Sequence, residues 1–416
     1  MAQHTFTSDF LSTMEARGYL KQLTHEAELD AYCAGDTEHG VPVAYVGYDA
    51  TADSLHVGSL LGIMALRRFQ QAGGKPIVLI GGGTTKVGDP TDKASSRPIL
   101  TEDEIARNAE GIRKAFEPFL VFGDGPTDAV MVNNDDWLSG LGYIDFLRDI
   151  GRYFTVNTMV KQDTVARRLK AEQPYTFLEF NYLLLQSYDF LELSRRRNCF
   201  LQMGGSDQWG NILGGADLIH KADGGQGFGL TWPLITTASG GKMGKTADGA
   251  VWLNADRKSP YEYWQFWRNT EDADVGRFLR LFTELPLGEI ARLEALEGAE
   301  INTAKIALAN AATALLHGVA AAREAEATAK STFETGSGEG LPTFEVMDGI
   351  GILDAVVTAG LAASNGEVRR HIKGGALKVN DARVDSHTRT VSASEAQDGV
   401  VKLSVGKKKH ALLRFH

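Results

Sequence analysis

The chain has few residues of the kinds that mark secreted, metal-bound or membrane-spanning proteins. Only two of its 416 residues are cysteine, Cys33 and Cys199, which argues against a disulfide scaffold and a zinc site. No apolar run approaches the roughly 18 residues of a membrane-spanning helix. The N-terminal segment lacks the basic-then-apolar order of a secretory signal and the arginine-rich composition of a transit peptide. We therefore expect a cytoplasmic protein with no membrane partner.

Two common phosphate-binding fingerprints are missing after the first predicted strand, residues 41–48. Neither the G-x-G-x-x-G of dinucleotide binders nor the G-x-x-x-x-G-K-[ST] loop follows it. Glycine is nevertheless abundant, with 46 residues of 416, well above the average of about 7%. This abundance indicates loops that approach a ligand closely.

Strands and helices alternate through the first half of the chain. Strands are expected at 41–48, 76–80 and 129–134, and helices at 55–71, capped by Ser54 or Asp53, and at 143–154. This alternation predicts a parallel, doubly wound sheet of the α/β class. Ligands of such sheets bind beyond the carboxyl ends of the strands.

Two motifs lie where helices are expected to begin after strands. His56 and Gly58 fall in the first turn of a helix, where free N–H groups attract phosphate. Gly58 lets a flat ring lie against the backbone, and His56 can donate to a phosphate oxygen. Asp207 follows another strand end and could accept from ribose hydroxyls. A helix cap explains a single histidine more simply, and explains Asp207 equally well.

Four cations lie on two glycine-rich segments. The loop at 81–97 contains Lys93 and Arg97, which could close over a polyphosphate. Lys242 and Lys245 lie three residues apart and could neutralise a leaving pyrophosphate. A mobile surface loop or a solvated turn explains either segment alone.

Three polar side chains share one face of an otherwise apolar helix. Tyr182, Gln186 and Asp189 lie at positions i, i+4 and i+7. Polar groups are seldom buried without partners. These side chains therefore reach water or line a polar pocket, and we favour the pocket.

Together these segments resemble the class I aminoacyl-tRNA synthetases. His56-Val57-Gly58-Ser59 is similar to their HIGH signature, and the segment KMGKT at 242–246 is similar to their KMSKS loop. The strings YVGYDATADSLHVG, GDPTDK, NYLLLQSYDF and GGSDQWGN are similar to those of bacterial tyrosyl-tRNA synthetases. The chain departs from the signature at Ser59, whose hydroxyl can form a hydrogen bond but cannot carry the charge of a histidine.

The resemblance implies a tyrosine–tRNA ligase with ATP as a substrate and Mg²⁺ chelated by the ATP. Tyrosyl-adenylate and pyrophosphate would form first, and tyrosine would then pass to the 3′ end of tRNA(Tyr). The tyrosine carboxylate is already a nucleophile, so the first step needs positioning and charge stabilisation rather than a general base.

The resemblance also implies the site residues. The catalytic set is Thr51, His56, Lys93, Arg97, Lys242 and Lys245. The tyrosine-binding set is Tyr45 and Asp189 at the phenol, Asp89, Tyr182 and Gln186 at the ammonium group, and Gly47 and Asp49. The ATP-binding set is His56, Gly58, Ser59, Gly205, Asp207 and Lys245, and Asn134 and Gln208 are second-rank candidates. No metal-ligating cluster is expected.

The C-terminal end has the character of an RNA-binding module. Residues 351–416 contain 11 Lys and Arg against 6 Asp and Glu, whereas the rest of the chain contains 32 against 47. Charge alone is explained more simply by a solvated surface. However, Ser364 and Glu367 predict a capped helix that presents Arg369, Arg370 and Lys373. A following hairpin near Asn380 makes the segment similar to a ribosomal-protein RNA-binding fold.

The expected domains follow from these features. A Rossmann-like catalytic domain would cover 1–240, the lysine loop and a helical anticodon-side domain 241–333, a linker 334–350, and a small basic α+β domain 351–416. The alanine-rich stretch at 303–330 predicts one long helix or a helical pair. The family resemblance further implies a homodimer.

Three alternatives remain open. A related ligase could adenylate a small carboxylate without tRNA, but the basic C-terminal module disfavours it. A tryptophan-specific synthetase is disfavoured by Tyr45 and Asp189, which suit a phenol. An RNA-binding protein without catalysis is disfavoured by the intact set of cations.

Overall fold

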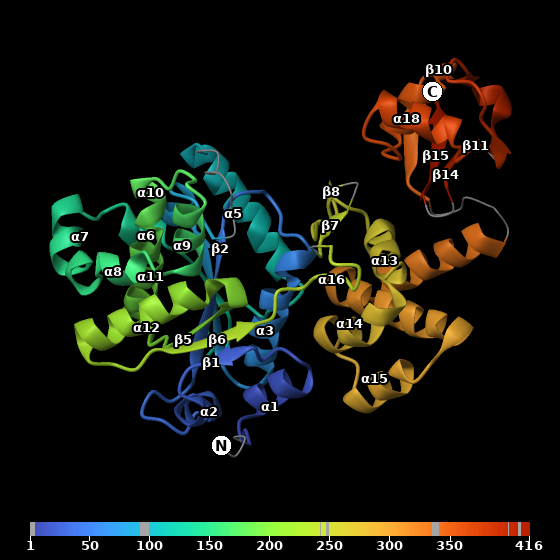
Figure 1. Cartoon of the computed structure of the whole chain (residues 1–416). Coiled ribbons are helices and arrows are strands. Elements are labelled where there is room, and N and C mark those ends of the chain that lie inside the picture. The colour runs from blue at the N-terminus through green and yellow to red at the C-terminus, as the bar shows by residue number, and fades with distance from the viewer. Residues whose placement is uncertain are drawn as a thin grey trace. The chain divides into compact units, whose positions relative to one another are not determined.

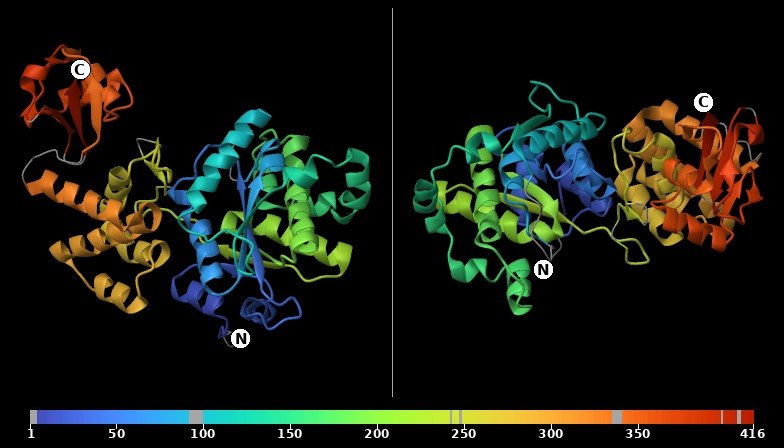
Figure 2. Two further views of the ribbon diagram at one scale, coloured as in Figure 1. Left: turned by 180° about the vertical axis from the view of Figure 1, so that it is seen from behind. Right: turned by 90° about the horizontal axis from the view of Figure 1, so that it is seen from above.

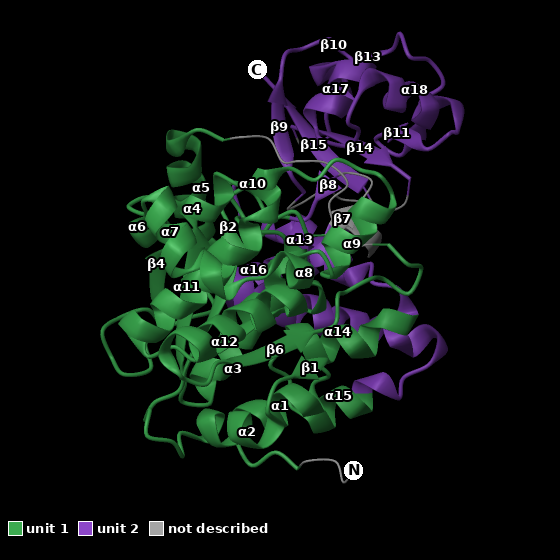
Figure 3. Cartoon of the chain, turned by 60° about the vertical axis from the view of Figure 1, so that its left-hand side comes forward, with its two compact units in different colours: residues 1–243, 252–254, 273–292 green, residues 244–251, 255–272, 293–416 purple. Residues whose placement is uncertain are grey.

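The computed structural model describes residues 5–91, 100–241, 243–246, 249–334, 341–397, 399–406 and 409–416. Three predicted catalytic residues, Lys93, Arg97 and Lys242, lie outside the described residues. The chain forms two compact units (Figure 3). Unit 1 contains residues 1–243, 252–254 and 273–292, and unit 2 contains residues 244–251, 255–272 and 293–416.

Unit 1 is built on a six-stranded sheet of order β1-β6-β5-β2-β3-β4 (Figure 1). The strands are β1 (Gln22–Leu23), β2 (Val43–Asp49), β3 (Lys75–Gly81), β4 (Val130–Asn133), β5 (Leu201–Gly205) and β6 (Phe228–Trp232). Strand β1 is antiparallel to β6, and the other neighbours are parallel. The predicted α/β class with a doubly wound parallel sheet is therefore confirmed.

Helices cover both faces of this sheet, so its central strands are apolar on both sides, as in β3 (KPIVLIG). Figures 1 and 2 show α11 (Tyr182–Arg197) and α12 (Trp209–Asp223) on one face, and α3 (Leu60–Gln71) and α5 (Glu102–Phe116) on the other. The remaining α-helices of unit 1 are α1 (Asp9–Ala16), α2 (Glu26–Ala34), α4 (Gly82–Thr85), α6 (Asp135–Leu138), α7 (Tyr143–Asp149), α8 (Val156–Met159), α9 (Asp163–Lys170), α10 (Phe177–Phe180), α14 (Val275–Phe282) and most of α15 (Leu287–Glu294).

The sheet opens where its strand order reverses. Strand β2 pairs with β3 over seven residues, from Val43 to Asp49. It pairs with β5 only at Ala44 and Tyr45. Strands β2 and β5 therefore separate toward their carboxyl ends. This is where the strand order reverses, because β3 lies on one side of β2 and β5 on the other. Such a point is the usual ligand site of an open α/β sheet.

Three local predictions need correction. The helix expected from residue 55 begins at Leu60 as α3, after a 3-10 turn, Val57–Ser59, and His56 rather than Ser54 or Asp53 caps that turn. The helix expected at 143–154 ends at Asp149, before a separate 3-10 turn. The loop expected at 81–97 begins with α4, because Asn134 accepts the N–H of Gly83 at 2.8 Å and helps to satisfy the first turn.

The helical part of unit 2 contains α13 (Pro260–Arg268) and α16 (Ile301–Glu334). Gly318 interrupts α16 with φ of 88°, which glycine adopts readily, so the helical-pair alternative is the correct one. By length and composition alone, the segment Gly298–Ser331 could cross a membrane. Ala304, Leu308 and Ala309 of this segment are buried within the fold.

Residues 341–416 form an α+β fold within unit 2. Its five-stranded sheet has the order β12-β11-β14-β15-β9. The strands and helices are β9 (Thr343–Val346), β10 (Ile350–Gly351), α17 (Ile352–Thr358), α18 (Asn365–Lys373), β11 (Leu377–Val379), β12 (Ala382–Arg383), β13 (Thr390–Val391), β14 (Val401–Val405) and β15 (Lys409–Phe415). The predicted hairpin is confirmed: Asn380 and Asp381 both have positive φ, as a two-residue turn of this kind requires.

Candidate active site

The carboxyl ends of the central strands bring polar side chains from distant segments together. Gly47 and Asp49 end β2, and Gly205 ends β5. Helix α11 adds Tyr182, Gln186 and Asp189 from its predicted polar face, in the same unit. The structure thus gathers the predicted tyrosine-binding residues at the opening between β2 and β5.

A buried carboxylate lies at the inner end of this site. Asp189 is 2% exposed and uses both of its oxygens as acceptors. The indole N–H of Trp137 donates to one at 2.7 Å, and the amide of Asn134 donates to the other at 2.8 Å. The hydroxyl of Tyr45 is also buried and has no hydrogen-bond partner among the described residues. A carboxylate beside an unpartnered hydroxyl can bind a phenol oxygen.

Burial controls the protonation of this carboxylate. Removal from water raises the pKa of Asp189 to about 7, and the negative charge of Asp49 acts in the same direction. The hydrogen bonds from Asn134 and Trp137 oppose the shift. Burial, together with the nearby charge of Asp189, raises the pKa of the Tyr45 hydroxyl well above its usual value. Tyr45 is therefore a neutral phenol at physiological pH.

A chain of hydrogen bonds leads outward from Asp189. Asn134 donates to both Asp189 and the hydroxyl of Thr84, at 3.0 Å for the latter. Thr84 donates to Asp49 at 3.0 Å. Asp49 also accepts the backbone N–H of Asp89 at 3.3 Å and faces the Tyr182 hydroxyl at 3.5 Å. The two ends of the predicted tyrosine site therefore belong to one connected network.

The outer end of the network contains several acceptors for a cation. The Asp89 carboxylate accepts from Gln208 at 3.0 Å. Asn211 donates to the carbonyl oxygens of both Gln186 and Gln208, at 3.0 and 3.1 Å. A carboxylate, a phenol oxygen from Tyr182 and two amide oxygens suit an ammonium group, which has only donors.

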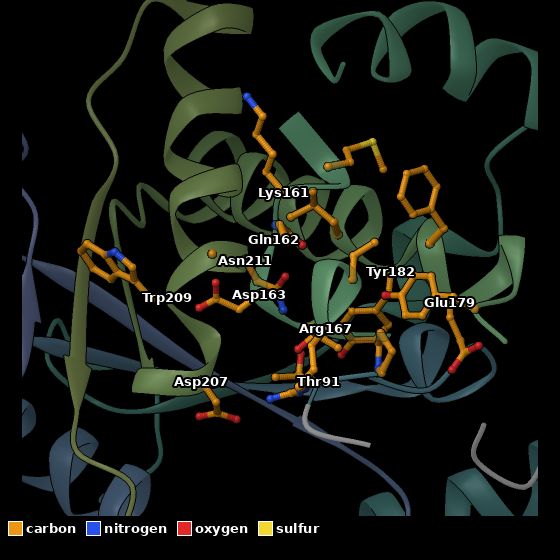
Figure 4. Close-up of a pocket in the computed structure, with 18 of the residues that line it drawn as sticks. Thr91, Lys161, Gln162, Asp163, Arg167, Glu179, Tyr182, Asp207, Trp209 and Asn211 are labelled. Atoms are coloured by element: carbon orange, nitrogen blue, oxygen red, sulfur yellow. The ribbon is translucent and has the colours of Figure 1, made fainter. Parts of the chain in front are cut away.

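A cavity of about 430 Å³ adjoins this outer end. Figure 4 shows Tyr182, Asp207 and Asn211 among its lining side chains, together with Lys161 and Arg167. The cavity is lined on one side by residues of α9 and α10 and on the other by the start of α12. It extends the polar site away from Asp189.

Four of the predicted nucleotide-binding residues follow the two central strands: His56 and Gly58 come after β2, and Gly205 and Asp207 come at the end of β5. The Nδ1 of His56 accepts the N–H of Gly58 at 3.0 Å, so a neutral His56 carries its proton on Nε2, where it can donate to a phosphate. A Cβ on Gly58 would lie 2.6 Å from the His56 ring, so only glycine fits there. Gly205 has a similar relation to Asp207, with a Cβ 2.4 Å from its carboxylate.

Several predicted residues are placed only in part. Thr51 is exposed just beyond β2, and Ser59 ends the 3-10 turn after His56. Lys245 belongs to β7 (Lys245–Thr246), which pairs with β8 (Gly249–Ala250) in unit 2, and the structure describes only its backbone. Arg369, Arg370 and Lys373 are exposed on α18, opposite the buried Val368 and Ile372.

Sequence reasoning missed Thr84, Trp137 and Asn211. Each lies in a short helix or in the first turn of a longer one. None of the sequence motifs described above assigns it a binding role. The polar cluster Asn133-Asn134-Asp135, directly after a strand, is the signal that could have pointed to Trp137. Asn134, which was only a second-rank candidate from the sequence, is fully buried at the centre of the network.

The raised pKa of Asp189 has a testable consequence. A carboxyl whose pKa is higher in the folded than in the unfolded chain stabilises the fold below its unfolded pKa, and this stabilisation is lost as pH rises through the folded pKa. Relative to Asp189→Asn, the natural chain should therefore lose thermal stability between about pH 4 and pH 7, and change little above pH 8. Melting temperatures of both proteins across this range test the expectation. A pH-independent difference would contradict the raised pKa.

Comparisons with known proteins identify the family. The family "tRNA synthetases class I (W and Y)" matches residues 37–334, and the family "Tyrosine--tRNA ligase SYY-like C-terminal domain" matches residues 332–413. The chain is 59% identical over 419 residues to a tyrosine–tRNA ligase of Caulobacter sp. (strain K31), covering 99% of both chains. It is 56% identical to that of Mesorhizobium japonicum, covering 98% of this chain and 99% of the relative.

A solved structure gives the same result. The C-terminally truncated mitochondrial tyrosyl-tRNA synthetase of Aspergillus nidulans superposes with a TM-score of 0.70 at 28% identity, covering 78% of this chain and 94% of that one. The chain therefore belongs to the tyrosine–tRNA ligases of the class I aminoacyl-tRNA synthetase family.

Proposed function

We propose how individual residues of this tyrosine–tRNA ligase act on L-tyrosine, ATP and tRNA(Tyr). The enzyme joins tyrosine to its tRNA at the expense of ATP. The observation that carries the residue assignment is the buried Asp189 carboxylate beside the unpartnered hydroxyl of Tyr45. In our proposal both groups bind the phenol oxygen of the substrate. Phenylalanine would leave them unpaired in a buried place, which is a strong basis for rejection.

The rest of the substrate then follows the network outward. The ammonium group would lie among Asp89, Tyr182 and Gln186, with Gln208 orienting Asp89. Asp49 would hold Tyr182 and the Asp89 backbone in place, and Gly47 would leave room for the substrate at the end of β2. This direction leaves the tyrosine carboxylate near the nucleotide residues.

For the nucleotide, we propose that the ribose faces Gly205 and Asp207, and that the adenine and phosphates lie against Gly58, Ser59 and His56. The tyrosine carboxylate attacks the α-phosphate, the bond to the β-phosphate oxygen breaks, and pyrophosphate leaves. The charge that develops on the leaving group needs cationic and hydrogen-bonding partners. Thr51, His56, Lys93, Arg97, Lys242 and Lys245 are the proposed partners.

We expect Mg²⁺ to enter with ATP. Among the described residues no group of three or more His, Cys, Asp or Glu could hold a metal ion. Mg²⁺ in ATP-dependent enzymes is often held largely by substrate phosphates and water. Bound there, it would neutralise part of the phosphate charge. We also propose a cytoplasmic location, in keeping with Cys33 and Cys199, which are both free and buried.

We propose that the predicted domain division is functional. Residues 1–240 would activate tyrosine, residues 241–333 would carry the lysine loop and face the anticodon side, and residues 351–416, after the linker 334–350, would bind tRNA. The last segment has a hydrophobic core of its own, which includes Ile352, Val368 and Leu413. Its exposed cations on α18 suit contacts with RNA phosphates.

Pyrophosphate exchange with each of the twenty amino acids in turn tests the substrate assignment. Tyrosine alone should support ATP–pyrophosphate exchange, and Asp189→Ala should lose discrimination against phenylalanine. The matched control is Asp217→Ala, an exposed aspartate paired with Lys221, which should leave the profile unchanged. Exchange with another amino acid would overturn the pocket assignment, and absence of exchange would favour the RNA-binding alternative.

Removal of residues 341–416 tests the role of the C-terminal domain. Exchange should persist because none of the proposed activation residues lies in the segment removed, whereas charging of tRNA(Tyr) should fall steeply. Neutralising Arg369, Arg370 and Lys373 in the full chain should weaken tRNA binding and reduce its salt dependence by up to about three charges. Loss of exchange after truncation would contradict the domain division, and an unchanged salt dependence would remove these three residues from the RNA interface.

We also propose a homodimer formed through the α7–α10 edge of unit 1. Large apolar side chains are exposed there, an arrangement typical of interaction sites: Tyr143, Ile144, Val156, Leu169, Phe177 and Leu178. Figures 1 and 2 show these helices gathered at one end of unit 1.

Replacement of one of these residues by a charge tests the dimer. Ile144→Asp should shift the protein from dimer to monomer in sedimentation velocity, because a buried, unpaired carboxylate opposes association. The control is Val121→Asp, a similarly exposed position in another part of unit 1, at 67% against 71% for Ile144. A monomeric natural chain at micromolar concentration would contradict the proposal.

A further inference from the structure

The segment that leads into the lysine loop is a compact turn in unit 1. Thr237 donates its N–H to the carbonyl of Gly241 at 2.8 Å, and Gly240 donates back to the carbonyl of Thr237 at 2.8 Å. Met243 donates its N–H to the carbonyl of Ile235 at 3.2 Å. We call residues 235–241 together with Met243 the stem. The stem contains the last described residues on either side of Lys242.

An ion pair at the start of α14 forms hydrogen bonds with this stem. Asp274 is 3% exposed, and its carboxylate accepts the N–H of Ala238 at 2.7 Å. Its other oxygen accepts from Arg277 at 2.6 Å. The same guanidinium nitrogen of Arg277 donates to the carbonyl of Thr236. The pair therefore binds one donor and one acceptor of the stem backbone, two residues apart.

The burial of Asp274 makes this contact selective. A carboxylate at that depth is costly unless its oxygens are hydrogen-bonded. Here one oxygen depends on the stem and the other on Arg277. Displacement of the stem would leave a buried acceptor unpaired, so the stem position seen here is stabilised over others. The Arg277 side chain is accessible to solvent, so its replacement tests the hydrogen bonds to the stem without creating a cavity in the core.

The other end of α14 is fixed to the body of unit 1. Arg17 donates to the carbonyls of Thr283 and Leu285 at 3.0 and 2.9 Å. Arg68 of α3 donates to the carbonyls of Leu281 and Thr283 at 3.2 and 3.3 Å. Two guanidinium groups at a helix C-terminus satisfy its free carbonyls and oppose its dipole. Helix α14 is thus a fixed support for the stem.

The stem also touches the first signature. A Cβ on Gly58 would lie 3.3 Å from the carbonyl oxygen of Met243, so the two backbones are in close contact. On the far side of the loop, Trp252 forms a β-bridge with His56, and Leu253 donates its N–H to the carbonyl of Leu55 at 2.9 Å. Both ends of the lysine loop are therefore held against the segment that contains His56 and Gly58.

We propose that Asp274 and Arg277 are positioning residues for adenylate formation. By fixing the stem to α14, they set where the lysine loop leaves unit 1 relative to His56 and Gly58. This inference rests on the proposed role of Lys242 and Lys245 in stabilising the leaving pyrophosphate. Charge stabilisation of this kind depends on placement to within about an ångström. The pair forms none of the hydrogen bonds described above for the tyrosine network, so we expect tyrosine binding to be little affected.

Replacement of Arg277 by alanine tests the proposal in the full-length enzyme. The rate of tyrosyl-adenylate formation at saturating substrates should fall by about tenfold, because the loop lysines would be placed less precisely against the leaving pyrophosphate. The dissociation constant for tyrosine should remain close to that of the natural chain, whereas the melting temperature should fall modestly because one buried oxygen of Asp274 loses its partner. The control is Arg292→Ala on α15 (Leu287–Glu294), because Arg292 pairs with Glu289 at the same spacing and distance, 2.6 Å, and should have no effect on the rate.

A double-mutant cycle separates positioning from general stability. In a Lys242→Ala/Lys245→Ala background, Arg277→Ala should cause little further loss, because it acts through those lysines. A loss equal to that in the natural chain, or a parallel fall in tyrosine affinity, would overturn the positioning role. If the lysine variant itself keeps the natural rate, the proposed function of the lysines fails. If only Arg277→Ala keeps it, the inference about the stem fails.

Discussion

The site depends on one fully buried amide, that of Asn134. Its oxygen accepts the N–H of Gly83 at the start of α4, and its nitrogen donates to Thr84 and to Asp189 on α11. The Asn134 side chain, which follows β4, thus sets the distance between the end of β3 and α11. An amide has donors and acceptors on opposite sides, which a carboxylate or a lysine in the same place would not provide. The phenol end of the site and the Asp49 network are aligned through this contact.

This arrangement suits a reaction that needs no general base. The tyrosine carboxylate already carries the charge that attacks phosphorus, so the protein gains most by holding both substrates in register. The connected hydrogen-bond network around Asp189 and Asp49 provides rigidity at the proposed amino-acid end. The proposed nucleotide end is more exposed to solvent. Thr51 is exposed there, and Gly58 has no side chain beside His56. The proposed assignment therefore combines a fixed amino-acid site with a more open phosphate site.

Sequence reasoning reached the fold class and many members of the network, because strand–helix alternation and a polar helical face are periodic signals. Tyr182, Gln186 and Asp189 were found in this way. Thr84, Trp137 and Asn211 were not, because their roles arise from contacts between segments about 25 to 50 residues apart. The start of α3 was also misplaced, since the side chain of His56 takes the capping role that Ser54 or Asp53 was expected to fill.

The position of His56 links its capping role to its chemistry. Because Nδ1 is used by the Gly58 N–H, the neutral ring can offer only a donor at Nε2, which is the group a phosphate oxygen requires. The same hydrogen bond fixes the ring over Gly58, where no side chain fits. A serine at position 59 is compatible with this geometry, because its side chain forms no capping hydrogen bond. The first signature can thus orient its histidine through its own backbone, without a charge at its fourth position.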